Sequence, residues 1–304
     1  MNIQQAQITT WGSTPTLQTI TLPPPAPSEL RIKALAIGIH RVVRSRAAGS
    51  HYSAKTLPHT PGIDGVGLTD DDQKVYFLTF GTGTLAEYVN MPKSAVYPLD
   101  LGVDPVQVAA SINPAMSSWM AFKGRTRDLP KGFTVLILGV TSASGRVAVP
   151  LARALGAGRV FGAARNEQAM EKLGLDRRIV IAEKAEETEF GDLDDVDVVL
   201  DYVYGLLAVH LFNSLKTPKP VQYVHIGALS EPEITIPGGV LRSKDITIRG
   251  SGPGAWSMKA FAETLPELLS IIPGIPEQPV EVAKFEELEE KWKYDGPKRL
   301  VFVP

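Results

Sequence analysis

Small polar residues and glycine are concentrated at residues 139–145, which read GVTSASG. An apolar stretch ends at Gly139, and Gly145 follows six residues later, where we expect a helix to begin. One glycine permits a tight turn and another permits close packing of the helix on a sheet, while free amides at the start of the helix attract phosphate oxygens. The spacing therefore predicts a pyrophosphate-binding turn. Its candidate residues are Gly139, Thr141, Ser142, Ala143, Ser144, Gly145 and Arg146.

Two positions in this turn leave alternatives open. Ser142 stands where such turns usually carry a glycine, and its hydroxyl group could donate to a phosphate while it narrows the approach slightly. Arg146 could reach the phosphates or could be an exposed arginine at the start of a helix. The whole segment could also be a strand-to-helix turn that holds no ligand, so its context in the fold decides.

The end of the next apolar stretch indicates which dinucleotide would bind. NAD sites usually carry an acidic residue about 20 residues past the glycines, where it binds the ribose 2′-hydroxyl. Here the sequence reads Ala163-Ala164-Arg165-Asn166, and Glu167 comes just beyond. Arg165 offers a planar, permanently charged donor for a 2′-phosphate, or it is a solvated surface arginine. Asn166 could donate to the same phosphate or cap the next helix. We therefore predict NADPH as the cofactor.

The elements that must position these residues alternate along residues 113–274. Short apolar runs suit parallel strands that are covered on both faces, and helical stretches lie between them. The expected strands are 134–138, 159–163, 178–182, 196–200, 221–226 and 245–249, and the expected helices are 145–155, 166–173, 206–215 and 257–272. This order predicts an α/β fold with a doubly wound parallel sheet of the Rossmann type.

The two ends of the chain have a different texture. Residues 30–39, 74–80 and 85–90 are expected to form strands of a β-rich domain. After a connector that contains Pro273, Pro276 and Pro279, we expect a strand at 280–285, a short helix at 286–293 and a strand at 299–303. We therefore predict one domain from residues 1–112 and 275–304, and a dinucleotide-binding domain from residues 113–274.

Composition excludes several classes of function. The chain has 304 residues and a formal net charge of -2, which gives no electrostatic reason to expect nucleic acid or a membrane surface as a partner. The absence of cysteine excludes disulfides, thiolate nucleophiles and metal sites built on cysteine. The first ten residues are polar, and no apolar run reaches the ~18 residues of a membrane span. We therefore expect a cytoplasmic protein.

Several motifs, in order along the chain, resemble those of the medium-chain dehydrogenases/reductases. Residues 59–67 (HTPGIDGVG) resemble the family turn P-G-x-[DE]-x-x-G, and residues 83–89 (GTLAEYV) resemble its strand G-[ST]-[FL]-A-E-[YF]-V. Residues 295–301 (DGPKRLV) resemble its closing G-K-x-V strand. Ile63 stands where the zinc-dependent branch has its histidine ligand. The chain therefore resembles the zinc-free quinone oxidoreductases of this superfamily.

This resemblance implies a GroES-like β-rich domain, made from both ends of the chain, and a Rossmann domain between them. It implies hydride transfer between the nicotinamide and a substrate in the cleft between the domains, with no metal. It also implies a homodimer joined through the sheet edge near residues 245–250.

The same resemblance places further candidate site residues. His40 lies where the family often has a hydrogen-bond donor beside the nicotinamide, and a histidine bonded in the core is an equal alternative. Tyr52 could form an aromatic wall for a flat substrate or could simply pack. Ser118 lies where the family contacts the nicotinamide ribose or carboxamide. The ends of the later strands should complete the cofactor site; their candidates are Tyr204, Gly227, Ala228, Ser251 and Gly252.

Together these features predict an enzyme that reduces a small-molecule substrate, either a quinone or an α,β-unsaturated carbonyl, with NADPH. Two other functions stay open. The chain could bind NADPH without turnover as a structural or regulatory protein, or it could be a biosynthetic enzyme that uses the same cleft for a specialised reduction or rearrangement.

Overall fold

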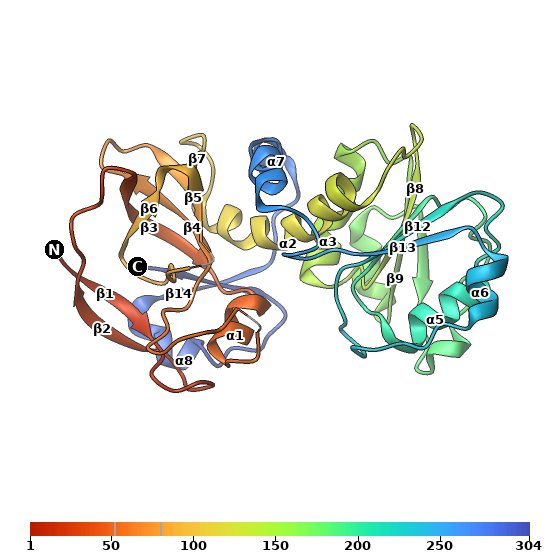
Figure 1. Ribbon diagram of the computed structural model, residues 1–304, viewed down its shortest axis with the longest axis horizontal. Helices are drawn as coiled ribbons and strands as arrows, with labels where there is room; N and C mark the ends of the chain where they lie inside the picture. Colours follow the sequence, from red (N-terminus) through yellow and green to blue (C-terminus); the bar gives the residue numbers. More distant parts are fainter. Residues whose placement is uncertain (52, 80) are drawn as a thin grey trace. The chain divides into compact units, whose positions relative to one another are not determined.

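The computed structural model describes residues 1–51, 53–79 and 81–304. The chain folds into two compact units (Figure 1). Unit 1 comprises Met1–Asn113 and Pro276–Pro304, and unit 2 comprises Pro114–Ile275. The first boundary falls inside helix α2 (Pro105–Arg125), so one continuous helix carries the chain from unit 1 into unit 2.

Unit 2, all of whose residues are described, contains a six-stranded parallel sheet in the order β10-β9-β8-β11-β12-β13. The chain runs outward from β8 to β10 and then returns to the other side of β8, so the order reverses between β8 and β11. A reversal of this kind opens a crevice at the carboxyl ends of the strands. The strands are β8 (Thr134–Leu138), β9 (Arg159–Ala164), β10 (Arg177–Val180), β11 (Val198–Asp201), β12 (Val221–His225) and β13 (Ile246–Gly250).

Both faces of the central strand β8 are buried, as its apolar run predicts, whereas the outer strands β10 and β13 are largely exposed. Val135 and Ile137 of β8 pack into one hydrophobic cluster, together with residues of α3, while Leu136 and Leu138 pack into a second cluster with residues of α5. Alternate side chains of one strand therefore serve two cores. The helices of unit 2 are α3 (Ala143–Ala154), α4 (Glu167–Met170), α5 (Gly205–Ser214), α6 (Gly238–Ser243) and α7 (Met258–Ile271), together with the part of α2 from Pro114.

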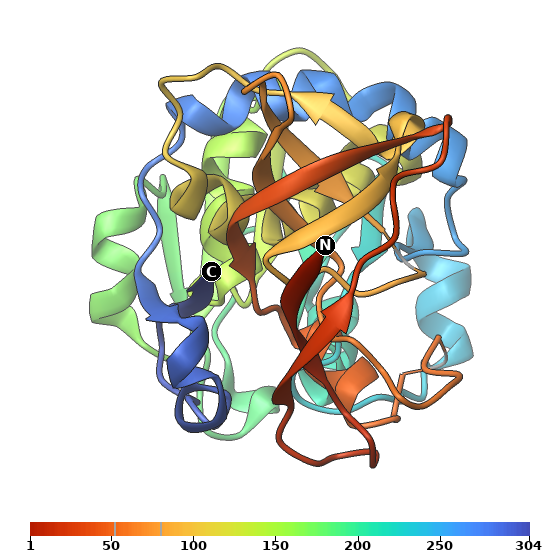
Figure 2. The ribbon, with the colours of Figure 1, turned by 90° about the vertical axis from the view of Figure 1, so that its left-hand side faces the viewer.

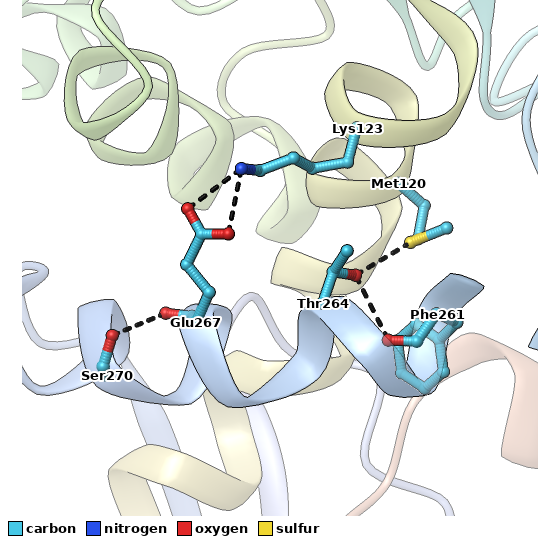
Figure 3. A network of polar contacts seen from close by, with 6 residues as sticks. All are labelled: Met120, Lys123, Phe261, Thr264, Glu267 and Ser270. Atoms are coloured by element: carbon cyan, nitrogen blue, oxygen red, sulfur yellow. Dashed lines mark hydrogen bonds and ion pairs between the residues drawn. The ribbon is translucent and has the colours of Figure 1, made fainter. Parts of the chain in front are cut away.

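Helix α7 is tied to α2 by polar contacts within unit 2 (Figure 3). Lys123 Nζ on α2 lies 2.9 Å from both carboxylate oxygens of Glu267 on α7. The hydroxyl group of Thr264 lies 3.8 Å from the sulfur of Met120. The ion pair is partly exposed, so it adds little stability.

Unit 1 is β-rich, and its strands come from both ends of the chain (Figures 1 and 2). Among its described residues, β1 (Asn2–Gln7) and β2 (Thr16–Thr21) form an antiparallel pair. A larger sheet runs in the order β14-β15-β3-β4-β5-β7, and β6 also pairs with β3. Its strands are β3 (Glu29–Gly38), β4 (Asp64–Thr69), β5 (Lys74–Leu78), β6 (Tyr88–Pro92), β7 (Val96–Pro98), β14 (Val280–Lys284) and β15 (Arg299–Val303), and the short helices are α1 (Arg41–Ala47) and α8 (Leu288–Lys291).

Differences from the expected bounds occur in both units; in unit 2, for example, the helix expected at 166–173 consists of α4 (Glu167–Met170) and a 3-10 turn at Glu171–Leu173. The expected strand at 85–90 begins at Tyr88, because the backbone of the preceding residues bonds elsewhere: Leu85 donates to Pro61 and accepts from Ala6, and Glu87 donates to Gln4. The expected strand at 74–80 ends at Leu78. The strands at 134–138 and 299–303 have the predicted bounds.

Candidate cofactor-binding site

Helix α3 begins directly after a tight turn at the end of β8. Gly139 has a φ of 81°, in the left-handed region that favours glycine. The hydroxyl oxygen of Ser142 accepts a hydrogen bond from the amide of Gly145 at 3.1 Å. Because this N-cap fixes the first turn early, the helix begins at Ala143, and the expectation that it begins at Gly145 is wrong. In unit 2, which is described throughout, the amides of Ala143 and Ser144 have no hydrogen-bond partner and stay free for an anion.

Gly145 is required for the packing of this helix on the turn. A Cβ atom at position 145 would lie 2.3 Å from the carbonyl oxygen of Gly139 and 2.7 Å from the Cα atom of Val140, and both of these are backbone atoms. The close approach sets the amino end of α3 against the end of β8. The role predicted for this glycine therefore has a steric basis in the structure.

A cavity of about 640 Å³ adjoins the turn at the carboxyl ends of β8 to β11. This volume lies within the range of about 300–1,000 Å³ that is typical of small-molecule sites. Four of the predicted residues line it: Gly139, Thr141, Ser142 and Arg165. The other predicted cofactor residues do not line this cavity.

Arg165 directly follows β9, lines this cavity and is exposed. Its guanidinium group forms no ion pair within the fully described unit 2, so it is available for a ligand. Of the two roles left open for Asn166, capping is present: its Oδ1 accepts the amide of Ala169 at 2.9 Å. Arg146 donates from Nε to the carbonyl oxygen of Thr141 at 2.9 Å, which tethers its guanidinium group to the turn before α3.

A buried carboxylate shapes the loop after β11. Asp201 Oδ1 accepts the amides of Val203 at 2.7 Å and Tyr204 at 3.0 Å, and Oδ2 accepts the hydroxyl group of Tyr223. Burial raises the pKa of Asp201. Tyr204 is thereby held with a φ of 62°, and its ring lies 4.0 Å from the ring of His225. Such backbone strain in a non-glycine residue often marks a functional position.

Ser118 faces its own helix in this structure. It is fully buried, and its hydroxyl group donates to the carbonyl oxygen of Ala115 at 3.1 Å. Its neighbour Ser117 donates to Pro114 at 2.6 Å and lies 3.4 Å from the hydroxyl group of Tyr202. Burial raises the pKa of Tyr202 to about 12, so this phenol stays protonated at neutral pH.

Gly227, Ala228, Ser251 and Gly252 follow the carboxyl ends of β12 and β13. The amide of Gly227 donates to the carbonyl oxygen of Asp201 at 3.1 Å, which fixes the first of these loops. A Cβ atom on Gly252 would meet nothing within 4 Å, and one on Gly227 would make only ordinary contacts. The packing of the protein itself therefore does not require glycine at either position.

His40 belongs to a buried polar network in unit 1. Its Nε2 lies 3.1 Å from Asp64 Oδ1, and the hydroxyl group of Tyr76 donates to Asp64 Oδ2 at 2.9 Å. His40 and Asp64 are 1% and 0% exposed. Burial lowers the pKa of His40, although the nearby Asp64 opposes that shift. The arrangement matches the core histidine that was the alternative for this position; Tyr52 lies outside the described residues.

The described residues contain neither a group of side chains that could hold a metal ion nor a helix that could span a membrane. Across residues 1–51, 53–79 and 81–304, no group of three or more His, Asp or Glu side chains is placed to hold a metal ion. Within the same ranges, no helix combines the length and the apolar character needed to cross a bilayer.

Sequence reasoning missed part of the cavity wall. The segment after β10 contributes Ile181, Ala182, Glu183 and Lys184, and the loop after β12 contributes Leu229, Ser230 and Glu231. The signal for the first segment was its place at a strand end beside β9, since carboxyl ends of neighbouring parallel strands share one edge. The segment lacks glycine and carries both charge signs, so no motif marked it.

Comparisons with known proteins agree with this fold. No protein-family model matches the chain. The chain is 36% identical over 317 residues to the Emericella nidulans protein named "Probable NADPH-dependent quinone reductase tdiC", a match that covers 88% of this chain and 89% of that protein. It is 28% identical to the quinone oxidoreductase of Sus scrofa over 49% of this chain and 48% of that protein.

Solved structures show the same fold at lower identity. The quinone oxidoreductase from Thermus thermophilus, which was also solved in complex with NADPH, superimposes with a TM-score of 0.76 at 23% identity over 99% of this chain and all of that chain. The quinone oxidoreductase from Pseudomonas syringae superimposes with a TM-score of 0.79 at 20% identity, over 99% of this chain and 100% of that chain. With a match at 36% identity over 88% of its length and this two-unit fold, the chain belongs to the quinone oxidoreductase-like family of the medium-chain dehydrogenases/reductases.

Proposed function

We propose that the protein binds NADPH at the carboxyl edge of the unit 2 sheet and uses it to reduce quinones or α,β-unsaturated carbonyls without a metal. The observation that carries this proposal is the cavity of about 640 Å³, which joins the turn before α3 to Arg165. The name of the Emericella nidulans relative supports both the cofactor and the substrate class.

The cavity and the turn that adjoins it suit two groups of the cofactor. The free amides of Ala143 and Ser144 would hold the pyrophosphate at the positive end of the α3 dipole. Ser142 would add its hydroxyl proton, because its oxygen already accepts the Gly145 amide. Arg165 would bind the 2′-phosphate through its planar guanidinium group.

Lys184 would add a second positive charge beside the 2′-phosphate. It lines the cavity and forms an exposed ion pair with Glu187 at 2.9 Å. Glu183, Glu186 and Glu231 also line the cavity, so its charge is mixed. Arg165 is the cation without a partner in the fully described unit 2, and we therefore assign the 2′-phosphate chiefly to it.

Bound NADPH supplies the hydride, and the protein supplies position and dipoles. For the nicotinamide half we propose the predicted residues that follow the ends of β11, β12 and β13, namely Tyr204, Gly227, Ala228, Ser251 and Gly252, with Ser118 on α2. We propose His40 as a positioning residue rather than a proton donor. Its Nε2 faces Asp64, and this leaves Nδ1, which is enclosed, as the unprotonated nitrogen of the neutral ring.

The test is direct. NADPH binding would be followed by the protein's fluorescence, and NADPH oxidation would be measured at 340 nm with a panel of small quinones and enones, with NADH as the comparison. We expect turnover with at least one quinone and a preference for NADPH over NADH. Tight NADPH binding with no turnover across the panel would instead favour the non-catalytic alternative, and absence of NADPH binding would refute the proposal.

We also propose that the protein forms a homodimer through β13. This strand pairs with β12 on one side, and within the fully described unit 2 no strand pairs with its other side. Ile248 is 37% exposed on this edge, where an uncovered strand invites pairing with another chain. Analytical ultracentrifugation should give a dimer mass, and Ile248→Pro should yield a monomer, because the amides of β13 alternate in direction and that of Ile248 points away from β12 to the free edge.

A further inference from the structure

His225 stands at the carboxyl edge of the sheet, outside the wall of the cavity beside Arg165. It is the last residue of β12, and in register it lies between Asp201 of β11 and Gly250 of β13. In a doubly wound sheet, the half formed by β11 to β13 receives the second mononucleotide of a dinucleotide. Since the phosphate turn and Arg165 belong to the β8 to β10 half, His225 lies in the half that would receive the nicotinamide.

Both the ring and the backbone of His225 have a neighbour that holds them in place. The ring of Tyr204 lies against the ring of His225 in a tilted arrangement, with ring centroids 4.0 Å apart and an interplanar angle of 32°. Tyr204 is itself pinned in its positive-φ conformation by the carboxylate of Asp201. The carbonyl oxygen of His225 accepts the amide of Ser251 at 2.8 Å. The structure therefore holds a tyrosine with a strained backbone against this ring. Such strain costs free energy and is typically found at functional sites.

The two ring nitrogens of His225 have different surroundings. Nδ1 is enclosed and has no hydrogen-bond partner in unit 2, which is described throughout. Nε2 has no partner either, but it is not among the enclosed atoms, so it can meet water or a ligand. A neutral imidazole has one protonated nitrogen. An enclosed N–H without an acceptor is costly, so the proton belongs on Nε2 and Nδ1 keeps a bare lone pair.

Protonation of the ring would place an N–H on the enclosed Nδ1. Burial accordingly lowers the pKa of His225, although Asp201 opposes this shift. The ring thus remains a neutral donor at physiological pH. A neutral donor suits a carbonyl oxygen, whereas it gives a phosphate no countercharge, and the carboxylate of Asp201 close by would repel one.

We propose that His225 donates a hydrogen bond from Nε2 to a carbonyl oxygen at the nicotinamide end of the site. This inference rests on the proposed function. Two carbonyls share the required chemistry: the carboxamide of the nicotinamide, and the substrate carbonyl. In the second case the hydride adds to the quinone or enone with its electron pair, negative charge gathers on the carbonyl oxygen, and the His225 N–H stabilises that charge until water protonates it.

Three substitutions separate the donor from the bulk of the ring. His225→Gln places an amide N–H near the position of Nε2, His225→Asn places its amide near Nδ1, and His225→Leu removes both polar atoms. We would measure the Kd for NADPH by fluorescence, kcat and KM with a quinone, and the folded fraction by circular dichroism. Lys259→Gln is the control, because Lys259 is exposed and lies on α7.

A bond to the carboxamide predicts that His225→Leu raises the Kd for NADPH about tenfold, as expected for the loss of one hydrogen bond. A bond to the substrate carbonyl predicts an unchanged Kd and a fall in kcat of about 100-fold. In both cases His225→Gln should keep most of the wild-type binding and turnover, and His225→Asn should not. Equal behaviour of Gln and Asn, or wild-type values in folded His225→Leu, would overturn the inference.

A second readout does not depend on activity. In NMR spectra of the NADPH-free protein, the ¹⁵N shifts of the His225 ring should show the Nε2–H tautomer and a pKa below the ordinary value of 6.5. An Nδ1–H tautomer would overturn the inference. Failure of the wild-type protein to bind NADPH would instead remove the proposed function, while leaving the measured tautomer as it is.

Discussion

His40 Nε2 and Asp64 Oδ1 lie 3.1 Å apart in a part of unit 1 that excludes solvent almost completely. The hydroxyl group of Tyr76 completes the set by donating to the other carboxylate oxygen. The carboxylate thus has a donor on each oxygen, which is the condition for keeping such a group buried. Asp64 is the acidic residue of the turn that resembles the family motif, so part of that motif has a structural role here.

The pH dependence of stability should report this network. Burial lowers the pKa of His40 in the folded state, so between that pKa and 6.5 the unfolded chain binds more protons than the folded one. Stability therefore rises with pH through this window and falls as the solution is acidified from pH 7. His40→Gln, which keeps an amide donor near Asp64 and cannot titrate, should lose less stability than the wild type between pH 7.5 and pH 5.

Thermal unfolding at the two pH values measures this difference. Carboxylates with lowered pKa values, such as Asp176 and Glu281, are common to both proteins and cancel in the comparison. The prediction is wrong if the two proteins lose the same stability on acidification.

The hydroxyl group of Tyr76 should be worth a measurable part of the folding free energy. Tyr76→Phe leaves one oxygen of a fully buried carboxylate without its donor, so we expect a loss of about 1–3 kcal/mol. Tyr97→Phe is the matched control, because Tyr97 lies opposite Tyr76 on the neighbouring strand, is partly exposed, and has a hydroxyl group that forms no hydrogen bond with the part of the chain that is described. Its substitution should change stability by less than about 0.5 kcal/mol.

Urea unfolding of the two variants provides the test. A Tyr76→Phe variant as stable as Tyr97→Phe would show that the hydroxyl group of Tyr76 contributes nothing to the network.

Gly145→Ala should impair the turn that we propose binds the pyrophosphate. The added Cβ would lie 2.3 Å from the carbonyl oxygen of Gly139, so the amino end of α3 must move away from β8. We expect a loss of stability of several kcal/mol and a loss of NADPH binding. Gly239→Ala is the control, since its Cβ would meet nothing within 4 Å in helix α6. Gly239→Ala should leave NADPH binding unchanged. Calorimetric titration of both variants with NADPH is the test, and equal binding by the two variants would contradict the prediction.

The sequence predicts unit 2 well because its signals are local. Apolar runs, the glycine spacing and the alternation of strand and helix each act within a few residues, so β8 has its predicted bounds and the turn after it has the predicted conformation at Gly139. The start of α3 was misjudged because an N-cap serine competed with a glycine as the first residue. Both are common at helix starts, and only backbone geometry decides between them.

Non-local features could not be predicted in the same way. The strand expected at 85–90 begins late, at Tyr88, because the backbone of Leu85 and Glu87 bonds to segments that lie far away in the sequence. The wall formed by residues 181–184 depends on which strand lies beside β9. His225 was overlooked for a similar reason: its significance comes from the enclosure of one nitrogen and from the ring of Tyr204, neither of which leaves a motif.

The preference for NADPH over NADH should depend on Arg165. This side chain lines the cavity without an ion pair in the fully described unit 2, and a charge-assisted bond to the 2′-phosphate contributes about 1.5–3 kcal/mol. Arg165→Gln should therefore raise KM or Kd for NADPH by about 10- to 150-fold and leave the values for NADH nearly unchanged. Arg178→Gln on β10 is the control, because Arg178 is exposed and lies outside the cavity wall. Steady-state kinetics with both cofactors would test this prediction. A parallel loss of affinity for NADPH and NADH would mean that Arg165 supports the fold of the site. No loss for either cofactor would assign binding of the 2′-phosphate to Lys184 instead.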